Sequence, residues 1–273
     1  MRISSLSVPH AVYSSMAVAQ RQTDRALAQL ATGKRIVSGS DDAAGSAISD
    51  QLDSYSRSYG AAERNTEYAQ SYFNVAEGSL NEQSNILTRL RELSVQAASD
   101  QFSSRERDLL QLEVEQLRQE FDRIAKTTKF GDRAILDGSQ QNYDFQVGIY
   151  NSANDRIRVS ISPSTTVSDL DLDSVQVSDV DDARDSLKSI DEASYQVAKA
   201  RAQFGSFATR LDSTRNHVQA MKQGAAEAEA RIADADLAES VTKVRRGQIL
   251  QQYQMAALTA HADLQNSYIK LVA

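Results

Sequence analysis

The sequence predicts a mainly α-helical protein built of long coiled-coil helical rods, with a small β-hairpin region near the middle of the chain. Three observations lead to this fold class. Apolar side chains recur at alternating steps of four and three residues, which keeps one stripe on one helix face. The 273 residues include only two prolines, so few positions interrupt a helix. One central region changes to an alternation of period two, which is typical of strands.

The first expected helix lies near the N-terminus. Its stripe consists of small and apolar side chains at positions Val12, Met16, Ala19, Thr23, Ala26 and Leu30. Gly33 follows at a place where the end of a helix favours a residue with positive φ. Because two alanines and a threonine fill half of the stripe, this helix buries too little apolar surface to be stable alone.

Two further helices follow in the N-terminal half. The first has an unbroken stripe from Ile48 to Ala97, and at about 1.5 Å per residue a helix of ~50 residues is ~75 Å long. The second has a stripe from Leu110 to Ile124. Ser103 with Glu106 three residues later predicts a capping box at its start.

The centre of the chain, residues 130–177, predicts a β-hairpin followed by a connector. Two runs alternate apolar with polar residues, and their apolar members are Phe145, Val147 and Ile149, then Ile157, Val159 and Ile161. Residues 151–155 supply a turn between the runs, so a hairpin is the simplest interpretation.

Aspartates crowd the segment after the hairpin, at positions Asp169, Asp171, Asp173, Asp179, Asp181, Asp182 and Asp185. Clustered carboxylates suit calcium, but the glycine and the closing glutamate of a calcium loop are missing. We therefore expect a solvated connector here, with Asp179 at the N-cap of the next helix.

Two helices complete the predicted fold. The first has a stripe from Ala183 to Val218 that includes Arg201 and Arg215, so its packing must be partly polar. The stripe of the last helix is rich in glutamine and comprises Leu237, Val241, Val244, Gln248, Gln251, Met255, Leu258, Ala262, Gln265 and Ile269. Like the first helix, it is expected to be marginal alone.

Composition excludes several functions. The chain has no cysteine, which rules out disulfides and thiolate metal sites, and its formal charge of −7 argues against binding nucleic acid. No stretch reaches the ~18 apolar residues of a membrane span, and the N-terminus lacks the apolar region of an ordinary signal peptide. Phosphate-binding loops, hydrolase elbows and zinc motifs are absent from the sequence. We expect no catalytic, metal-binding or cofactor-binding residues, no cofactor and no enzymatic activity.

An ordinary helical bundle within one chain is the simplest alternative, since an apolar stripe usually marks a core. The weak stripes, however, lie at the two ends of the chain, which suits ends that become ordered on assembly. A lipid-surface protein would show broad apolar faces with basic edges, whereas these stripes are narrow and the chain is acidic. A cytoplasmic coiled-coil scaffold remains an alternative.

Several motifs resemble those of bacterial flagellins. They are residues 30–36 (LATGKRI), 41–49 (DDAAGSAIS), 89–97 (RLRELSVQA), 231–236 (RIADAD) and 248–252 (QILQQ). They occur in the family's order and span both ends of the chain. The opening residues 1–5 (MRISS) are nearer to the hook–filament junction protein of the same family, whereas the DDAAG run is typical of filament subunits. We therefore prefer the filament subunit and keep the junction protein as the alternative.

The resemblance implies a subunit that polymerises into the flagellar filament for swimming motility, in a compact form without outer variable domains. It divides the chain into an inner-layer segment and joint (1–40), two helices of the outer rod (41–129), hairpin and connector (130–177), a third rod helix (178–229) and an inner-layer helix (230–273). The residues expected to pack in the inner layer are Val12, Met16, Ala19, Leu30, Leu237, Val241, Val244, Met255, Leu258 and Ile269.

The resemblance also implies secretion through a flagellar type III export channel and residence in the extracellular filament. Its partners would be copies of itself, other flagellins, a filament cap, hook-associated proteins and an export chaperone. Arg89, Leu93 and Glu113 match the surface that an innate immune receptor of the Toll-like class recognises in the family. The alternative is that these three residues bind a neighbouring subunit.

Overall fold

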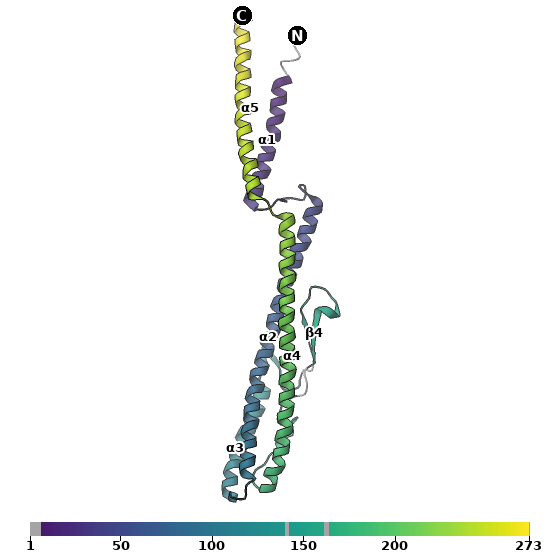
Figure 1. Ribbon diagram of the computed structural model, residues 1–273, viewed down its shortest axis with the longest axis vertical. Coiled ribbons are helices and arrows are strands. Elements are labelled where there is room, and N and C mark those ends of the chain that lie inside the picture. The colour runs from purple at the N-terminus through teal and green to yellow at the C-terminus, as the bar shows by residue number, and fades with distance from the viewer. Residues whose placement is uncertain (1–6, 140–141, 161–163, 273) are drawn as a thin grey trace. The chain divides into compact units, whose positions relative to one another are not determined.

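The computed structural model describes residues 7–139, 142–160 and 164–272, and it confirms the mainly α-helical fold (Figure 1). Its five α-helices are α1 (Ser7–Thr32), α2 (Ala43–Ala97), α3 (Ser104–Thr127), α4 (Val180–Ala233) and α5 (Leu237–Val272). Two antiparallel strand pairs lie between α3 and α4. They are β1 (Lys129–Phe130) with β2 (Arg133–Ala134), and β3 (Asn142–Gln146) with β4 (Arg156–Ser160).

The chain forms two compact units. The first combines residues 1–56 with 223–273 and contains α1, α5, the start of α2 and the end of α4. The second comprises residues 57–222 and contains most of α2 and α4 together with α3 and all strands. The boundaries thus fall inside two long helices. The predicted division into layers concerns an assembly and stays a prediction.

The core of the second unit forms where α2, α3 and α4 lie side by side (Figure 1). Every stripe position of α2 from Ala62 to Ala97 is buried, as the spacing predicted. Phe73, Leu80 and Leu87 are among its largest fully buried side chains. The prediction was wrong for Ile48, which is 50% exposed. In the first turns of α2 the buried positions are Gly45 and Ser49, so the buried stripe there is shifted by one residue from the predicted position at Ile48.

The predicted start of α3 is confirmed. The Ser103 hydroxyl accepts a hydrogen bond from the Glu106 amide at 3.4 Å, and the Glu106 carboxylate accepts one from the Ser103 amide at 2.7 Å. These bonds satisfy amide donors that the first helical turn leaves unpaired. The bond from the Ser103 amide is the main cause of the lowered pKa of Glu106.

Packing along α4 also follows the prediction, including its polar positions. Ile190, Val197, Phe204 and Leu211 are buried. Arg215 is half-buried and donates to the Gln70 side chain of α2 at 3.4 Å. The backbone oxygen of Asp179 accepts the first helical hydrogen bond, from Ala183, at 3.0 Å.

The hairpin is present, with a shifted first strand. Tyr143 pairs with Val159 and Phe145 with Ile157. The first strand ends at Gln146, because the amides of Val147 and Gly148 both donate to the Asp155 carbonyl, at 2.8 and 3.0 Å, and close a loop. Ile149 therefore lies in this loop, and Ile161 lies outside the described residues.

The connector after the hairpin is a correction to the prediction, because it packs into the core instead of lying in solvent. Its apolar residues Val167, Leu170, Leu172, Val175 and Val177 are all buried. They interleave with the aspartates, so the carboxylates reach water while the backbone stays on the core. The amide of buried Gln83 also holds this segment, donating to the carbonyls of Thr165 at 3.1 Å and Phe121 at 3.3 Å.

Candidate functional site

The candidate functional site is the helix pair that α1 and α5 form in the first unit. The two helices run antiparallel, since Gly247 lies beside Thr23 whereas Gln254, further along α5, reaches back to Ser15. Small side chains line the seam between them. Ala19, Thr23 and Ala26 of α1 are buried, as are Ser240, Val244 and Gly247 of α5.

Close approach and amide hydrogen bonds hold this pair together. A Cβ added at Gly247 would lie 2.0 Å from the Thr23 hydroxyl oxygen, so a larger residue would force Thr23 or the helix to shift at this crossing. Further along, the Gln251 amide donates to the Gln20 side chain at 2.6 Å, and the Gln254 amide to the Ser15 hydroxyl at 3.3 Å. The pair thus buries small side chains and polar groups, and few large apolar ones.

Backbone hydrogen bonds connect the segment after α1 to the segment between α4 and α5; we call this connection the joint. Gly33 adopts φ +70°, as its C-terminal position predicted. Beyond it, the Arg35 amide donates to the Ala233 carbonyl at 2.6 Å, and the Ala235 amide donates to the Gly33 carbonyl at 2.9 Å. The Arg35 guanidinium donates to the Ile232 carbonyl at 2.7 Å. The chain segments that leave α1 and α4 are thereby tied together.

Charged groups add to this joint. The Glu229 carboxylate pairs with the Lys34 ammonium at 3.2 Å and accepts a hydrogen bond from the Ser49 hydroxyl at 3.3 Å. The Asp41 carboxylate accepts bonds from the amides of Val37 and Ser38 and pairs with Arg25 at 3.0 Å. The bond from the Ser38 amide is the main cause that lowers the pKa of Asp41.

The structure brings together part of the expected inner-layer residues. Ala19 and Val244 are buried in the seam, and Val12, Met16, Leu30 and Leu258 are half-buried. Leu237, Val241 and Met255 are instead exposed, by 54%, 47% and 52%. Ile269 lies in α5, but its side chain is outside the described residues.

The apolar spacing of α5 does not mark the side that faces α1, for a physical reason, and packing of the expected residues in an inner layer of the assembly stays a prediction. The side that faces α1 contains Ser240, Val244, Gly247, Gln251 and Gln254, which are mostly small or polar. A search for apolar spacing passes over Gly247, although glycine at a heptad-spaced position is the signal of a close helix approach. The expected stripe therefore combined residues from two sides of the helix.

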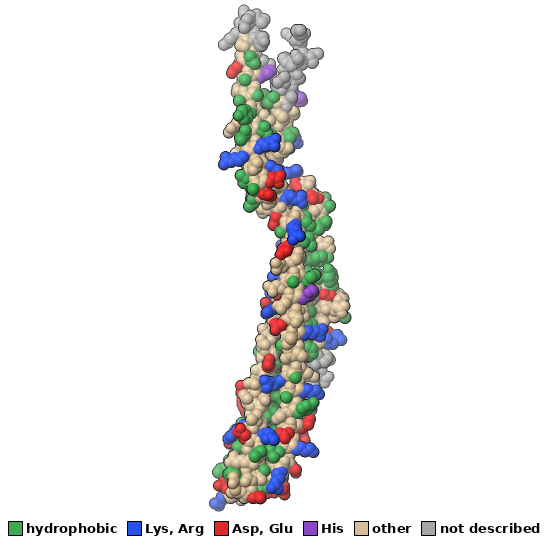
Figure 2. Space-filling view, viewed as in Figure 1, with side chains coloured by type: hydrophobic (Ala, Val, Ile, Leu, Met, Phe, Trp, Pro, Cys, Tyr) green, Lys and Arg blue, Asp and Glu red, His purple; other side chains and the backbone are tan. Residues whose placement is uncertain are grey.

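A second surface of α5 is apolar and exposed in the subunit. We call it the α5 outer surface, and it consists of Leu237, Val241, Ile249, Leu250, Tyr253, Met255 and Leu264. Apolar side chains are visible along α5 in Figure 2. Residues 247–262 contain no Asp, Glu, Lys or Arg. A helix that is apolar on several sides is normally enclosed by other elements.

The residues expected at a receptor surface lie at the contact between α2 and α3 in the second unit. The Arg89 guanidinium pairs with the Glu113 carboxylate at 2.7 Å and with Glu92 at 3.1 Å. The hydrogen bond to Glu113 is the main cause that raises the pKa of Arg89. Leu93 is only 1% exposed, so the structure places an exposed ion pair here beside a buried leucine.

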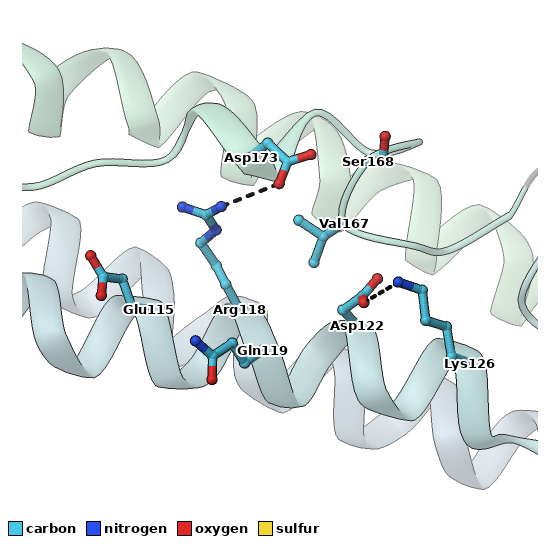
Figure 3. A pocket seen from close by; sticks show the side chains of 8 residues that line it. All are labelled: Glu115, Arg118, Gln119, Asp122, Lys126, Val167, Ser168 and Asp173. Carbon is cyan, nitrogen blue, oxygen red and sulfur yellow. Dashed lines mark hydrogen bonds and ion pairs between the residues drawn. The ribbon is translucent and has the colours of Figure 1, made fainter.

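A polar cleft lies on the second unit between α3 and the connector (Figure 3). Four of its five charged groups form pairs, Arg118 with Asp173 at 3.2 Å and Lys126 with Asp122 at 2.6 Å. The fifth, the Glu115 carboxylate, accepts a hydrogen bond from the Gln111 amide at 3.3 Å. Arg118 also donates to the Val175 carbonyl at 3.3 Å, so it holds the connector on α3. The cleft is therefore explained by packing of the connector.

Within residues 7–139, 142–160 and 164–272, no three His, Asp or Glu side chains are placed to hold a metal ion. None of the five helices that the structure describes contains a stretch that is both long and apolar enough to cross a bilayer.

Comparison with known proteins places these features in a family. The bacterial flagellin N-terminal helical region matches residues 3–141, and the bacterial flagellin C-terminal helical region matches residues 187–272. The chain belongs to the bacterial flagellin family. Among the described residues between α3 and α4 there are only short strands, short 3-10 turns and the connector, so this is a compact form of the flagellin fold.

Individual relatives agree over most of the chain. The flagellar filament core protein flaB2 of Brachyspira hyodysenteriae is 31% identical over 261 residues, with 90% of each chain covered. A flagellin of Halalkalibacterium halodurans is 32% identical over 250 residues, also with 90% of each covered. The crystal structure of Bacillus cereus flagellin is 30% identical with a TM-score of 0.51, covering 60% of this chain and 94% of that chain.

Proposed function

We propose that this flagellin is a structural subunit that polymerises into the bacterial flagellar filament, and that copies contact one another through the α5 outer surface. The relative from Brachyspira hyodysenteriae carries the name of a filament core protein, which supports the filament subunit over the hook–filament junction protein. The observation that carries the contact is the exposed apolar surface on α5 together with its charge-free run, residues 247–262.

The energetics favour burial of this surface between copies. Burying apolar area contributes roughly 25 cal/mol per Å², and the α5 outer surface remains exposed in the single subunit. Because residues 247–262 carry no charge, the same surface of several copies can approach without desolvating or opposing ions. Repetition along a lattice adds many modest contacts into a stable polymer.

The exposed side of α1 is less apolar than that of α5. Arg21, Asp24 and Arg25 are exposed on α1, and Arg25 pairs with Asp41. Three large apolar side chains are also exposed on α1, namely Tyr13, Val18 and Leu27, compared with the seven of the α5 outer surface. The larger exposed apolar surface of α5 supports it as the helix that further copies enclose.

The test is polymerisation of purified full-length protein after salting-out, followed by electron microscopy. The wild-type chain is expected to form straight fibres. Ile249→Glu and Tyr253→Glu together should leave a soluble helical subunit that forms none, because each change places a charge on the contact. Ile249→Leu with Tyr253→Phe keeps the surface apolar and should polymerise normally. Normal fibres from the charged variant would refute the proposed contact.

A deletion separates the role of the whole helix from that of its surface. Removing residues 237–273 is expected to leave a soluble, partly helical monomer, since the core of the second unit is built from α2, α3, α4, the hairpin and the connector, none of which is removed. This monomer should not polymerise. Fibres from the truncated protein would refute assembly through α5 altogether.

We further propose that the chain is exported unfolded by a type III flagellar system and resides outside the cell in the filament. The helices at the two ends of the chain bury mostly small and polar side chains, which suits a chain that must cross a narrow channel before it folds. The filament cap, hook-associated proteins, other flagellins and an export chaperone are its proposed partners. Loss of extracellular protein in a strain lacking the export system would support this route, and unchanged secretion would refute it.

Recognition of Arg89, Leu93 and Glu113 by an innate immune receptor is a second proposal, supported by the exposed Arg89–Glu113 ion pair. Leu93 is buried under this pair, so we propose that its part is to support the helix surface. Receptor-reporter cells exposed to soluble monomer test the idea. Arg89→Ala should reduce the signal and Arg105→Ala should not; silence with the wild-type monomer would end the proposal.

A further inference from the structure

Met255 combines exposure with an unusual position on α5. Its side chain is 52% exposed in the subunit, within the charge-free run. Its neighbours Gln251 and Gln254 use their amide groups to bond Gln20 and Ser15 of α1. The thioether therefore lies open to solvent at the border between the α1 seam and the α5 outer surface.

The other methionines of the chain occupy different environments. Met1 lies outside the described residues, and Met16 is half-buried on α1. Met221 is 43% exposed, nearly as much as Met255, but it lies on α4 in the second unit. Met221 therefore provides a matched reference for a reaction that depends on exposure alone.

We propose that Met255 is a modification site at which peroxide oxidation of an unassembled subunit prevents its incorporation into the polymer. The inference rests on the function proposed above. In the reaction a sulfur lone pair attacks one oxygen of hydrogen peroxide, an S–O bond forms and the O–O bond breaks. The proton of the attacked oxygen passes, directly or through solvent, to the leaving oxygen, which departs as water. Sulfur is oxidised by two electrons and the peroxide is reduced, giving methionine sulfoxide.

The sulfoxide changes the physics of the contact. It replaces a polarisable apolar side chain with a strong hydrogen-bond acceptor. Residues 247–262 supply no Lys or Arg donor, and the Gln251 and Gln254 amides already bond α1; the side-chain donors left there are neutral, such as the Gln252 amide and the Tyr253 hydroxyl. Burying the strongly hydrated sulfoxide between copies costs its hydration, which the unoxidised thioether does not have to give up, so oxidation opposes association. Once subunits have assembled, the same burial protects the thioether from peroxide.

A competition within one sample tests the proposal without any variant. Soluble wild-type protein is treated with hydrogen peroxide until about half of Met255 is oxidised, and it is then polymerised from unoxidised seeds. Peptide mass spectrometry compares the sulfoxide fraction in fibres and supernatant. Met255 sulfoxide should be depleted from the fibres about tenfold, which corresponds to ~1.4 kcal/mol, while Met221 sulfoxide should distribute equally. Equal distribution at Met255 would overturn the inference.

Two substitutions and the finished polymer complete the test. Met255→Leu should polymerise after peroxide treatment as before it, whereas Met221→Leu should remain as sensitive as the wild type. In finished fibres, Met255 should oxidise about tenfold more slowly than in the subunit. Met255→Leu losing its assembly to peroxide would overturn the inference. Failure of the untreated wild type to form fibres would instead refute the proposed function, and the inference with it.

Discussion

Gly247 of α5 and Thr23 of α1 meet at the point where the two end helices pack most closely. A Cβ at position 247 would lie 2.0 Å from the Thr23 hydroxyl oxygen and 3.2 Å from its Cβ. The hydroxyl itself donates to the Ala19 carbonyl at 2.8 Å, which fixes its position on α1. Backbone contact of this kind lets two thin helices pair without large side chains.

We expect Gly247→Ala to separate α1 from α5, although alanine favours a helix by about 1 kcal/mol over glycine. The added methyl group overlaps the Thr23 hydroxyl, and moving the helices apart exposes the seam. Hydrogen exchange of the amides in α1 measures the effect, which should be faster exchange in the variant. Gly224→Ala is the matched control, since nothing lies within 4 Å of its added Cβ; it should slow exchange or leave it unchanged.

A second prediction concerns buried Gln83, whose amide ties α2 to the end of α3 and to the connector. Gln83→Ala should destabilise the protein by about 2–4 kcal/mol, because it leaves a cavity and a buried carbonyl without a donor. Gln83→Met fills the volume but restores no donor, so it should recover only part of the loss. Urea unfolding measures both. Exposed Gln96→Ala should change stability by less than ~0.5 kcal/mol; an equal loss there would contradict this account.

How much of the fold and of the candidate site could be predicted from the sequence depends on the kind of packing in each part. The stripe of α2 from Ala62 to Ala97 was predicted because mostly apolar residues, with Phe73, Leu80, Leu87 and Leu90 at its centre, repeat there at coiled-coil spacing, and all of it is buried. Features that depend on local chemistry were also predicted from the sequence. The Ser103–Glu106 capping box and the positive φ of Gly33 depend on a few neighbouring residues and are both present.

Features that depend on contacts between distant segments were missed. The connector looked solvated because aspartates dominate its composition, yet Leu172 and Val175 are fully buried against the second unit. The side of α5 that faces α1 could not be predicted, because the contact is made by Gly247 and polar side chains, and spacing of apolar residues does not detect these. In both cases the surface that packs against the segment decides which side is buried. That surface comes from residues far away in the chain, so the pattern within the segment does not reveal it.

A third prediction follows from Asp41 at the joint. Its pKa in the folded protein is lowered below the usual 3.8, chiefly by the bond from the Ser38 amide. The carboxylate therefore stabilises the joint fully above pH ~3.8. This contribution falls as the pH drops from there through the lowered value. Amides of residues 36–42 should lose hydrogen-exchange protection over that acidic window. In Asp41→Asn the loss should disappear, because an amide does not titrate; an unchanged profile in this variant would contradict the role of Asp41.

The last prediction concerns the order of the two units in a dilute subunit. The seam between α1 and α5 buries Ala19, Thr23 and Gly247, whereas the core of the second unit buries Phe73, Leu80 and Phe121. Apolar burial scales with side-chain area, so the first seam contributes much less free energy to folding. Amides in α1 and α5 should open more readily than those of residues 62–97, by at least ~1.4 kcal/mol, which is tenfold in the opening equilibrium.

Hydrogen exchange on dilute and polymerised protein measures this difference in opening. The joint allows a more detailed expectation. Amides at Arg35 and Ala235 donate to backbone carbonyls outside the helix pair, so they should stay protected longer than amides in the middle of α1. Polymerisation should raise protection in α5 most strongly, because its outer surface then becomes buried. Uniform protection along the whole chain in the dilute subunit would mean that the end helices are stable alone. Assembly would then contribute nothing to their order.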